Sequence, residues 1–485
     1  MKRFLPTFLR CTLFVLLTFF PLLLVSPSAV HAQWEPDVRL TYNDSSSSTS
    51  WPNARCIVAR GDTVHVVWYD QRDGNLEVYY KRSTDSGISW SSDTRVSFDS
   101  SWSEHPSVAA SGAVVHVAWV DSRNGWPNTD IYYKRSTDGG SSWGPENRLT
   151  YDPGSSDYLS LAASGMAVHA VWTDDRDGHI GEIYYKRSTD AGATWQADTS
   201  LTMGLPNSYY PCVAASGSEV HLVWWSENGG YHDIFYKRSL DNGMTWSGNA
   251  LLTTVSNWAG CPTIAVSGSM VHIVWEDDRD SPQWPEIYYK KSSDRGITWG
   301  PDVRLTYNPA PSWEPNVAAS GQRVHVVWYD ERDSMGTNLF YLRSLDDGIT
   351  WGPETRLTYP ITYKFHPFVS ATGSKTHVVW TDDRAGNYEI YYKRNPTDSS
   401  SGVEVSPPVS LSPCPLVPLS VIPSPFTSYA SVPGHSSERF ALYDISGRKV
   451  GTYKGDRIGS GLSAGIYFLK PENKDAKPLR IVKLR

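Results

Sequence analysis

The sequence lacks the features that usually mark metal-binding, helical or nucleic-acid-binding proteins. Of its 485 residues five are cysteines, and Cys56, Cys212, Cys261 and Cys414 show neither zinc-ligand spacing nor a C-x-x-C pair. No segment in the repeats has the length and apolar period of a helix. The net charge is −7, and no Lys/Arg block or basic stripe is present, which argues against nucleic-acid binding. We therefore expect no metal, no cofactor and no nucleic-acid partner.

Long apolar runs are also scarce, and the one that stands out lies at the N-terminus. Basic residues precede the apolar stretch 13–25, and a small-residue cleavage site ends at Ala32. This stretch is shorter than the ~20 residues that a membrane-spanning helix needs. Residues 1–32 are therefore predicted to be a signal peptide. The mature chain is expected to be secreted, with no membrane span.

What the chain has in abundance is one repeated stretch, built on the core V-H-x-V-W. Each copy contains four short β-like runs separated by Gly, Asn and Asp, which is the size and composition of a propeller blade. The sequence thus predicts an all-β, seven-bladed β-propeller over residues 33–402. A histidine present in every unit is interpreted as a core residue. Cys212 and Cys261 fall near the same place in neighbouring repeats, so a bridge is conceivable, although free buried thiols are expected. The repeat histidines are His65, His116, His169, His221, His272, His325 and His377.

A sharper motif, S-x-D-x-G-x-[ST]-W, ends most repeats. Its Asp can accept hydrogen bonds from backbone N–H groups inside a hairpin turn, and its Gly can adopt a left-handed conformation. The motif resembles the Asp box (BNR repeat) of the sialidase superfamily. In that family these turns lie opposite the active site, so the resemblance implies a structural role. Its aspartates are Asp85, Asp138, Asp190, Asp241, Asp294 and Asp346.

The seventh copy of this motif, at Asp398, has no Trp. However, residues 34–42 match residues 299–307 almost residue for residue. We expect residues 34–42 to be the fourth strand of the last blade, with Trp34 completing the motif of Asp398. Such closure also removes an exposed sheet edge.

Beyond the repeats, residues 403–430 are rich in Pro and Ser and are predicted to be a linker. Residues 431–485 contain Y-D-x-x-G-[RK]-x-V, then G-[LI]-x-x-G-x-Y-F, then a short basic and apolar strand. This pattern resembles the type A sorting domain of type IX secretion, which implies a small β-sandwich and a partner in the secretion machinery. It also implies that the chain is secreted or displayed on a bacterial outer surface. A generic β-sandwich is the alternative.

The propeller topology defines two faces. The Asp-box turns share one face, here called the turn face, and the loops between blades and between second and third strands share the other, the loop face. A repeated D-x-R-D motif lies in the loops of the loop face, except in the fourth blade. It is interpreted either as local Arg–acid pairs or as a ring of guanidiniums that binds carboxylates or sugar hydroxyls. The arginines are Arg72, Arg123, Arg176, Arg279, Arg332 and Arg384.

The loops between blades differ from one blade to the next, which a scaffold would not require. They place aromatic rings beside carboxylates, a combination suited to stacking on sugars and binding their hydroxyls. The alternative is that these side chains fill the central channel. The candidate ligand-binding residues are Trp102, Glu104, His105, Trp258, Trp313, Glu314 and His366.

Arg55 stands where most other blades have proline. Sialidases carry a carboxylate-binding arginine there, in R-I-P, whereas this chain has Arg55-Cys-Ile. By that resemblance Arg55 is a candidate catalytic and ligand-binding residue, with Asp73 as acid and a tyrosine as nucleophile. We expect a glycan-recognising propeller, with an exo-sialidase-type hydrolase and a protein-binding scaffold as alternatives. The candidate tyrosines are Tyr209, Tyr210 and Tyr363.

Overall fold

The structure is a computed structural model that describes residues 34–397 and 439–483. Gaps fall at 126, 177, 179–180, 206, 254–257, 282–283, 334–335, 360–361, 445–447, 455–457, 459–462, 464 and 472–478. The predicted signal peptide, the linker and Asp398 lie outside the described residues. The chain divides into two units, Met1–Val405 and Ser406–Arg485. In the described ranges there is no helix, and hence none that could cross a membrane.

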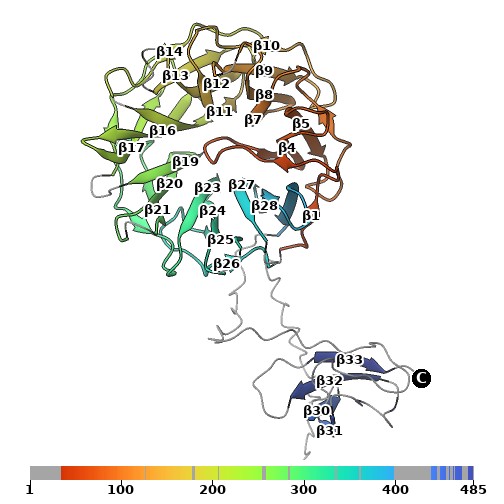
Figure 1. Cartoon of the computed structure of the whole chain (residues 1–485). Coiled ribbons are helices and arrows are strands. Elements are labelled where there is room, and N and C mark those ends of the chain that lie inside the picture. The colour runs from red at the N-terminus through yellow and green to blue at the C-terminus, as the bar shows by residue number, and fades with distance from the viewer. Residues whose placement is uncertain are drawn as a thin grey trace, which may run out of the picture. The chain divides into compact units, whose positions relative to one another are not determined.

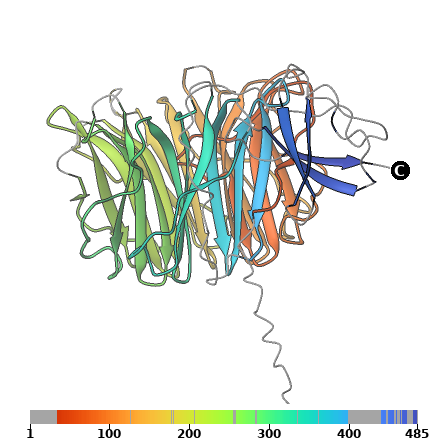
Figure 2. The ribbon, with the colours of Figure 1, turned by 90° about the horizontal axis from the view of Figure 1, so that it is seen from below.

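The first unit is a ring of antiparallel sheets around a central axis (Figure 1). The described residues 38–395 form seven sheets, six of four strands and one in which the inner strand is split into two pieces. Viewed from the side, the strands run from one face of the ring to the other (Figure 2). The all-β propeller predicted from the repeats is confirmed.

The strands are grouped by their distance from the axis. The innermost are β2 (Ser47–Ser48) with β3 (Ile57–Arg60), β7 (Ser103–Ser111), β11 (Ser156–Ser164), β15 (Ser208–Ser216), β19 (Ala259–Ser267), β23 (Ser312–Ser320) and β27 (Lys364–Thr372). The second strands are β4 (Thr63–Asp70), β8 (Val114–Asp121), β12 (Ala167–Asp174), β16 (Glu219–Asn228), β20 (Met270–Asp277), β24 (Arg323–Asp330) and β28 (Lys375–Asp382). The third strands are β5 (Glu77–Ser83), β9 (Asp130–Ser136), β13 (Glu182–Ser188), β17 (Tyr231–Ser239), β21 (Glu286–Ser292), β25 (Asn338–Ser344) and β29 (Glu389–Asn395). The outermost are β6 (Thr94–Arg95), β10 (Asn147–Arg148), β14 (Thr199–Ser200), β18 (Ala250–Leu251), β22 (Val303–Arg304), β26 (Thr355–Arg356) and β1 (Val38–Arg39).

The V-H-x-V-W strand is buried on both of its faces because each sheet packs between two others. Its tryptophan is fully buried in every copy, from Trp68 to Trp380. The histidine is a buried core residue, as predicted, and its Nδ1 lies 2.6 to 2.8 Å from the hydroxyl of a third-strand tyrosine in the same sheet.

The same tyrosines lock neighbouring sheets together. The ring of Tyr133 meets Trp195 of the next sheet edge-on, with centroids 5.0 Å apart. Its hydroxyl also lies so close to Gly192 that a Cβ atom at this residue would clash with it. Glycine is required at Gly192 because of this contact and because its φ is +78°.

The turn that holds Gly192 is organised by Asp190. Its carboxylate accepts from the backbone N–H of Thr194 at 2.9 Å and from the Thr194 hydroxyl at 2.6 Å. These bonds, the Thr194 hydroxyl first, lower the pKa of Asp190 to about 2. The aspartate therefore stabilises the turn, which is the role expected from the sequence.

The N-terminal strand closes the ring. β1 pairs with β29, placing Val38 opposite Tyr392, so the predicted displaced strand is confirmed. Trp34 meets Tyr341 edge-on at 4.9 Å and 82°, the contact that Trp195 makes with Tyr133. Trp34 thus occupies the place of the tryptophan missing from the seventh repeat.

The second unit is small. Its described residues form one antiparallel sheet in the order β31-β30-β32-β33. The strands are β30 (Arg439–Asp444), β31 (Lys449–Lys454), β32 (Gly465–Pro471) and β33 (Leu479–Lys483). A second layer, and with it the predicted sandwich, stays a prediction.

Candidate functional site

The innermost strands are bent near the loop face. In β7 the register shifts between Glu104 and Ser107, and the residue in the bulge, His105, has a φ of +51°. Positive φ is strained for residues other than glycine. Five other sheets repeat this bulge at the same level, so equivalent side chains form a ring around the axis. The bulge residues are His105, Tyr158, Tyr210, Cys261, Glu314 and His366.

The first sheet replaces this bulge with a longer excursion. Its inner strand is split into β2 and β3, and residues 49–55, here called the plug segment, leave the sheet between them. Figure 1 shows this part of the chain, beside β4, reaching into the middle of the ring. Asn53 holds the plug segment there by donating to the carbonyls of Tyr158 at 2.7 Å and Pro211 at 3.1 Å. The loop-face end of the axis is therefore filled by the chain itself.

Trp51 of the plug segment is the centre of the ring of bulge residues. Its ring stacks on His105 with centroids 5.0 Å apart and lies 5.9 to 6.3 Å from Tyr158, Tyr210 and His366. We call Trp51 and the six bulge residues the axial cluster. It includes four of the candidate site residues, His105, Tyr210, Glu314 and His366. Their role in ligand binding stays a prediction.

Carboxyl groups with raised pKa values surround this cluster on one side. Burial, with a contribution from the charge of Asp157, raises the pKa of Glu104 to about 7. Burial likewise raises the pKa of Asp157 to about 6. The two raised pKa values allow these carboxyl groups to differ in protonation near neutral pH.

A second carboxyl pair lies on another side of the cluster. Burial raises the pKa of Glu276 to about 8, and the nearby charge of Glu314 adds to the effect. Glu276 also accepts a short hydrogen bond from the backbone N–H of Glu314. Oε2 of Glu314 lies 2.8 Å from Nδ1 of His366. A carboxyl group with a raised pKa, that of Glu276, therefore lies beside the carboxyl group that contacts His366.

The repeated arginines of the loop face are engaged elsewhere. Arg279 pairs with Asp277 at 2.5 Å and Asp302 at 2.6 Å, and its guanidinium lies 4.5 Å from the ring centre of Tyr288. These contacts occupy its donors and favour the structural interpretation of D-x-R-D. Two or three carboxylates likewise pair with each of Arg72, Arg123, Arg176, Arg332 and Arg384.

The remaining sialidase-type candidates do not converge. Asp73 pairs with Arg95 at 3.0 Å and accepts a hydrogen bond from Tyr79 within its own sheet. Arg55 lies in the central channel, where it donates to the carbonyls of Val213 at 3.2 Å and Ile264 at 2.7 Å. The carboxylate clamp implied by the sialidase resemblance therefore has no support from these contacts.

The other candidate residues frame the axial cluster. Tyr209 stacks on Trp225 at 5.1 Å, and the ring of Trp258 packs so closely over Gly260 that a Cβ atom there would clash with it. Trp313 opens β23 just before the bulge. Trp102 and Tyr363 precede β7 and β27, and each is 51% exposed, so both present aromatic surface to solvent.

An open groove of about 470 Å³ lies beside the cluster on the loop face. Trp284, Tyr363 and Phe365 provide aromatic walls, Pro309 and Pro311 rigid ones, and Glu331 a carboxylate. Its aromatic and proline walls with one carboxylate make it a candidate ligand-binding groove, since such sites are mostly apolar with a few polar groups.

Glu276, which contacts the axial cluster through Glu314, was missed by the sequence analysis. Glu276 lies between the Trp and the Asp of V-H-x-V-W-x-D, in a strand whose residues were all interpreted as part of the core. The variation of this position among the repeats could have indicated a role outside the common core, since other blades have Tyr69, Val120, Thr173 or Trp225 there. Cys261, like Cys56 and Cys212, is a free thiol, as expected. In the described ranges no group of three His, Cys, Asp or Glu residues is placed to hold a metal.

Comparison with known proteins gives structural neighbours alone. No family model and no curated protein matches the chain. A polysaccharide lyase of family PL25, an ulvan lyase, has a TM-score of 0.53 at 11% identity, covering 74% of this chain and 95% of its own. The same lyase bound to -[GlcA(1-4)Rha3S]- gives 0.52 at 11% identity and the same coverage. The Hadza microbial sialidase Hz136 gives 0.43 at 13%, over 71% of this chain and 74% of that one. At these identities the likeness to the lyase shows the fold.

Proposed function

We propose that this propeller recognises glycans on its loop face, around the axial cluster and the adjoining groove. The observation that supports the proposal is that the loop-face residues near the axis differ between otherwise similar sheets. The cores and turns repeat from sheet to sheet, whereas the residues nearest the axis on the loop face change chemical type around the ring, from His105 to Tyr158 to Glu314. A scaffold built from equal units needs no such differences, but a binding site for an asymmetric ligand does.

The chemistry of these residues fits a sugar. Trp102 and Tyr363 offer exposed rings for stacking, and the half-buried carboxyl and imidazole groups of the cluster can exchange hydrogen bonds with hydroxyls. The ulvan lyase, whose fold is related to that of this chain, is a polysaccharide lyase, so glycans are the first ligands to test.

A glycan array probed with the full chain tests this proposal. The wild type should bind a defined class of glycans, and Trp102→Ala combined with Tyr363→Ala should weaken that binding at least tenfold. Ile297→Ala with Ile349→Ala removes comparably exposed side chains, 63% and 72%, from the turn face and should leave binding unchanged. Failure of the wild type to bind any glycan would overturn the proposal and leave the protein-binding scaffold as the surviving alternative.

A second candidate function is cleavage of the bound glycan. The pair of Glu104 and Asp157, with pKa values of about 7 and about 6, supplies a proton donor and a base at neutral pH. This differs from an exo-sialidase, whose arginine clamp the contacts of Arg55 do not favour. Glu104→Gln should keep glycan binding but abolish release of reducing ends. Equal turnover by wild type and Glu104→Gln would exclude this role for the pair.

The N- and C-terminal sequence patterns lead us to propose export as well. Mass spectrometry of the protein recovered outside the producing cells should find Gln33 as the first residue. An intact residue 1–32 segment on the exported chain would contradict cleavage at Ala32.

A further inference from the structure

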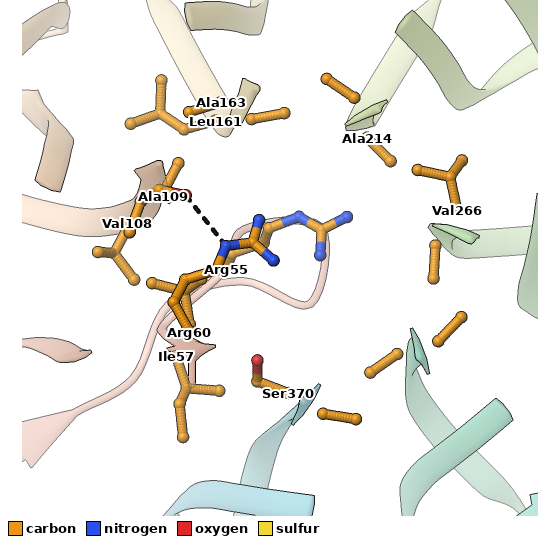
Figure 3. A pocket seen from close by; sticks show the side chains of 18 of the residues that line it. Arg55, Ile57, Arg60, Val108, Ala109, Leu161, Ala163, Ala214, Val266 and Ser370 are labelled. Atoms are coloured by element: carbon orange, nitrogen blue, oxygen red, sulfur yellow. Dashed lines mark hydrogen bonds between the residues drawn. The ribbon is translucent and has the colours of Figure 1, made fainter. Parts of the chain in front are cut away.

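A closed-ended cavity of about 120 Å³ lies on the propeller axis, beneath the plug segment (Figure 3). Its wall is made by the V-A-A stretches of the innermost strands, such as Val108 to Ala110 in β7. Since a buried water needs only ~10–15 Å³ of such space, the cavity can hold a small hydrated ion.

Two arginines of the first sheet enter this apolar cavity. Figure 3 shows the guanidinium groups of Arg55 and Arg60 reaching into it from the same side. At the place of Arg60, at the end of the inner strand, the other sheets have serine or threonine. These equivalents are Ser111, Ser164, Ser216, Ser267, Ser320 and Thr372. In the first sheet, Arg60 thus replaces the serine or threonine of the other repeats.

The hydrogen bonds of these arginines leave charge uncompensated. Arg60 donates from Nε to the carbonyl of Ala110 at 3.2 Å. Arg55 donates from Nη2 to two carbonyls across the ring, while its buried Nε has no hydrogen-bond partner among the described residues. None of the residues that line the cavity is acidic. This contrasts with the loop-face arginines, each of which pairs with at least two carboxylates.

Electrostatics makes this arrangement costly without a counter-ion. Burial and the charge of Arg55 both lower the pKa of Arg60. Although Arg60 is partly open to solvent, the cavity wall offers no acidic side chain to offset the two like charges, and an anion between the two guanidinium groups would remove their repulsion.

The cavity is reached from the turn face. Residues 49–55 fill the loop-face end, whereas Arg60 is exposed next to the turn at Gly61. That turn belongs to the turn face, because the N–H of Ser86 in the first Asp-box motif donates to the carbonyl of Asp62 at 2.7 Å.

We propose that the central channel is a binding site for one small oxyanion, held between Arg55 and Arg60 and entering from the turn face. Sulfate, phosphate and the carboxylate of a larger ligand share the required chemistry, since planar guanidinium groups bind two oxygens of such groups at once. This site is separate from the proposed glycan site, which lies on the other side of the plug segment.

Isothermal titration of the full chain at constant ionic strength, with sulfate, phosphate, acetate and chloride in turn, tests the proposal. The wild type should bind one oxyanion per chain, more tightly than chloride. Arg60→Ser, which gives the first sheet the residue of its neighbours, should weaken that binding at least tenfold. The control Arg295→Ser removes a 60% exposed arginine from the same face and should change the affinity for the oxyanion less than twofold. A preference for acetate would identify the carboxylate of a larger ligand as the natural occupant, and a preference for sulfate or phosphate a free ion.

Thermal unfolding supplies a second readout. In buffer without oxyanions the unfolding temperature of Arg60→Ser should equal or exceed that of the wild type, because the substitution removes the repulsion between the two arginines. Saturating sulfate should raise the unfolding temperature of the wild type but not that of Arg60→Ser. The proposal is overturned if no oxyanion binds the wild type saturably, or if Arg60→Ser binds as the wild type does.

Discussion

The repeat histidines show how a single residue type can be set by its surroundings. Burial, with a smaller effect from Arg135, lowers the pKa of His116 to about 4, and its Nδ1 meets the hydroxyl of Tyr133 at 2.7 Å. Recurrence in every unit was enough to predict this core role from the sequence. The roles of Glu276 and Asp157 could not be predicted in this way, because their pKa values depend on burial by parts of the chain far away in sequence.

These histidines should make the stability of the propeller pH-dependent. The folded-state pKa of His116, about 4, lies below the unfolded value near 6.5. The unfolded chain therefore takes up the proton first, so stability is complete above pH ~6.5 and falls as the pH drops toward 4. Urea unfolding between pH 6 and 5 should show a slope about 1.4 kcal/mol per pH unit smaller in His116→Asn than in the wild type. Equal slopes would contradict a neutral buried histidine.

At the scale of the element, the Asp-box turn is both a hairpin and a contact between sheets. The motif predicted the hairpin because Asp, Gly and Trp each have a local role in it. It did not predict that Gly192 packs against Tyr133 of the preceding sheet, which follows from the curvature of the ring. The plug segment was missed for a similar reason. Its path depends on carbonyl groups such as that of Pro211, which local pattern does not reveal.

Gly192→Ala should therefore destabilise the protein far more than an alanine at another left-handed glycine. Gly165 has a φ of +60°, and a Cβ atom added there would meet no atom within 4 Å, so Gly165→Ala should cost only the backbone penalty of about 1–2 kcal/mol. Gly192→Ala adds a clash with the Tyr133 hydroxyl and should cost about 3 kcal/mol or more. Unfolding curves of the two variants measure the difference. Similar losses would mean that the contact between sheets carries little energy.

At the scale of the whole molecule, ring closure was predictable because residues 34–42 repeat residues 299–307 almost letter for letter. The structure adds that Asp37 pairs with Arg384 at 2.5 Å, as Asp302 pairs with Arg279 at 2.6 Å. The N-terminal segment thus supplies the same contacts as an ordinary fourth strand.

Trp34→Ala should therefore lower the free energy of unfolding as much as Trp299→Ala does. Trp34 meets Tyr341 at 4.9 Å and Trp299 meets Tyr236 at 4.8 Å, both edge-on, so each variant should lose about 2 kcal/mol of unfolding free energy. Thermal and urea unfolding of both variants check this equality. A Trp34→Ala protein as stable as the wild type would show that closure does not depend on this contact.

The central claim is that the loop face, with its unlike residues, is the functional face and that the turn face around the Asp-box motifs does not contact the glycan. Hydrogen exchange of the full chain, with and without the glycan that binds best on the array, tests it most directly. We predict slower exchange in residues 102–106, 207–211, 313–316 and 363–367, and unchanged exchange in the turns 188–195 and 292–299. Protection confined to those turns would contradict the account.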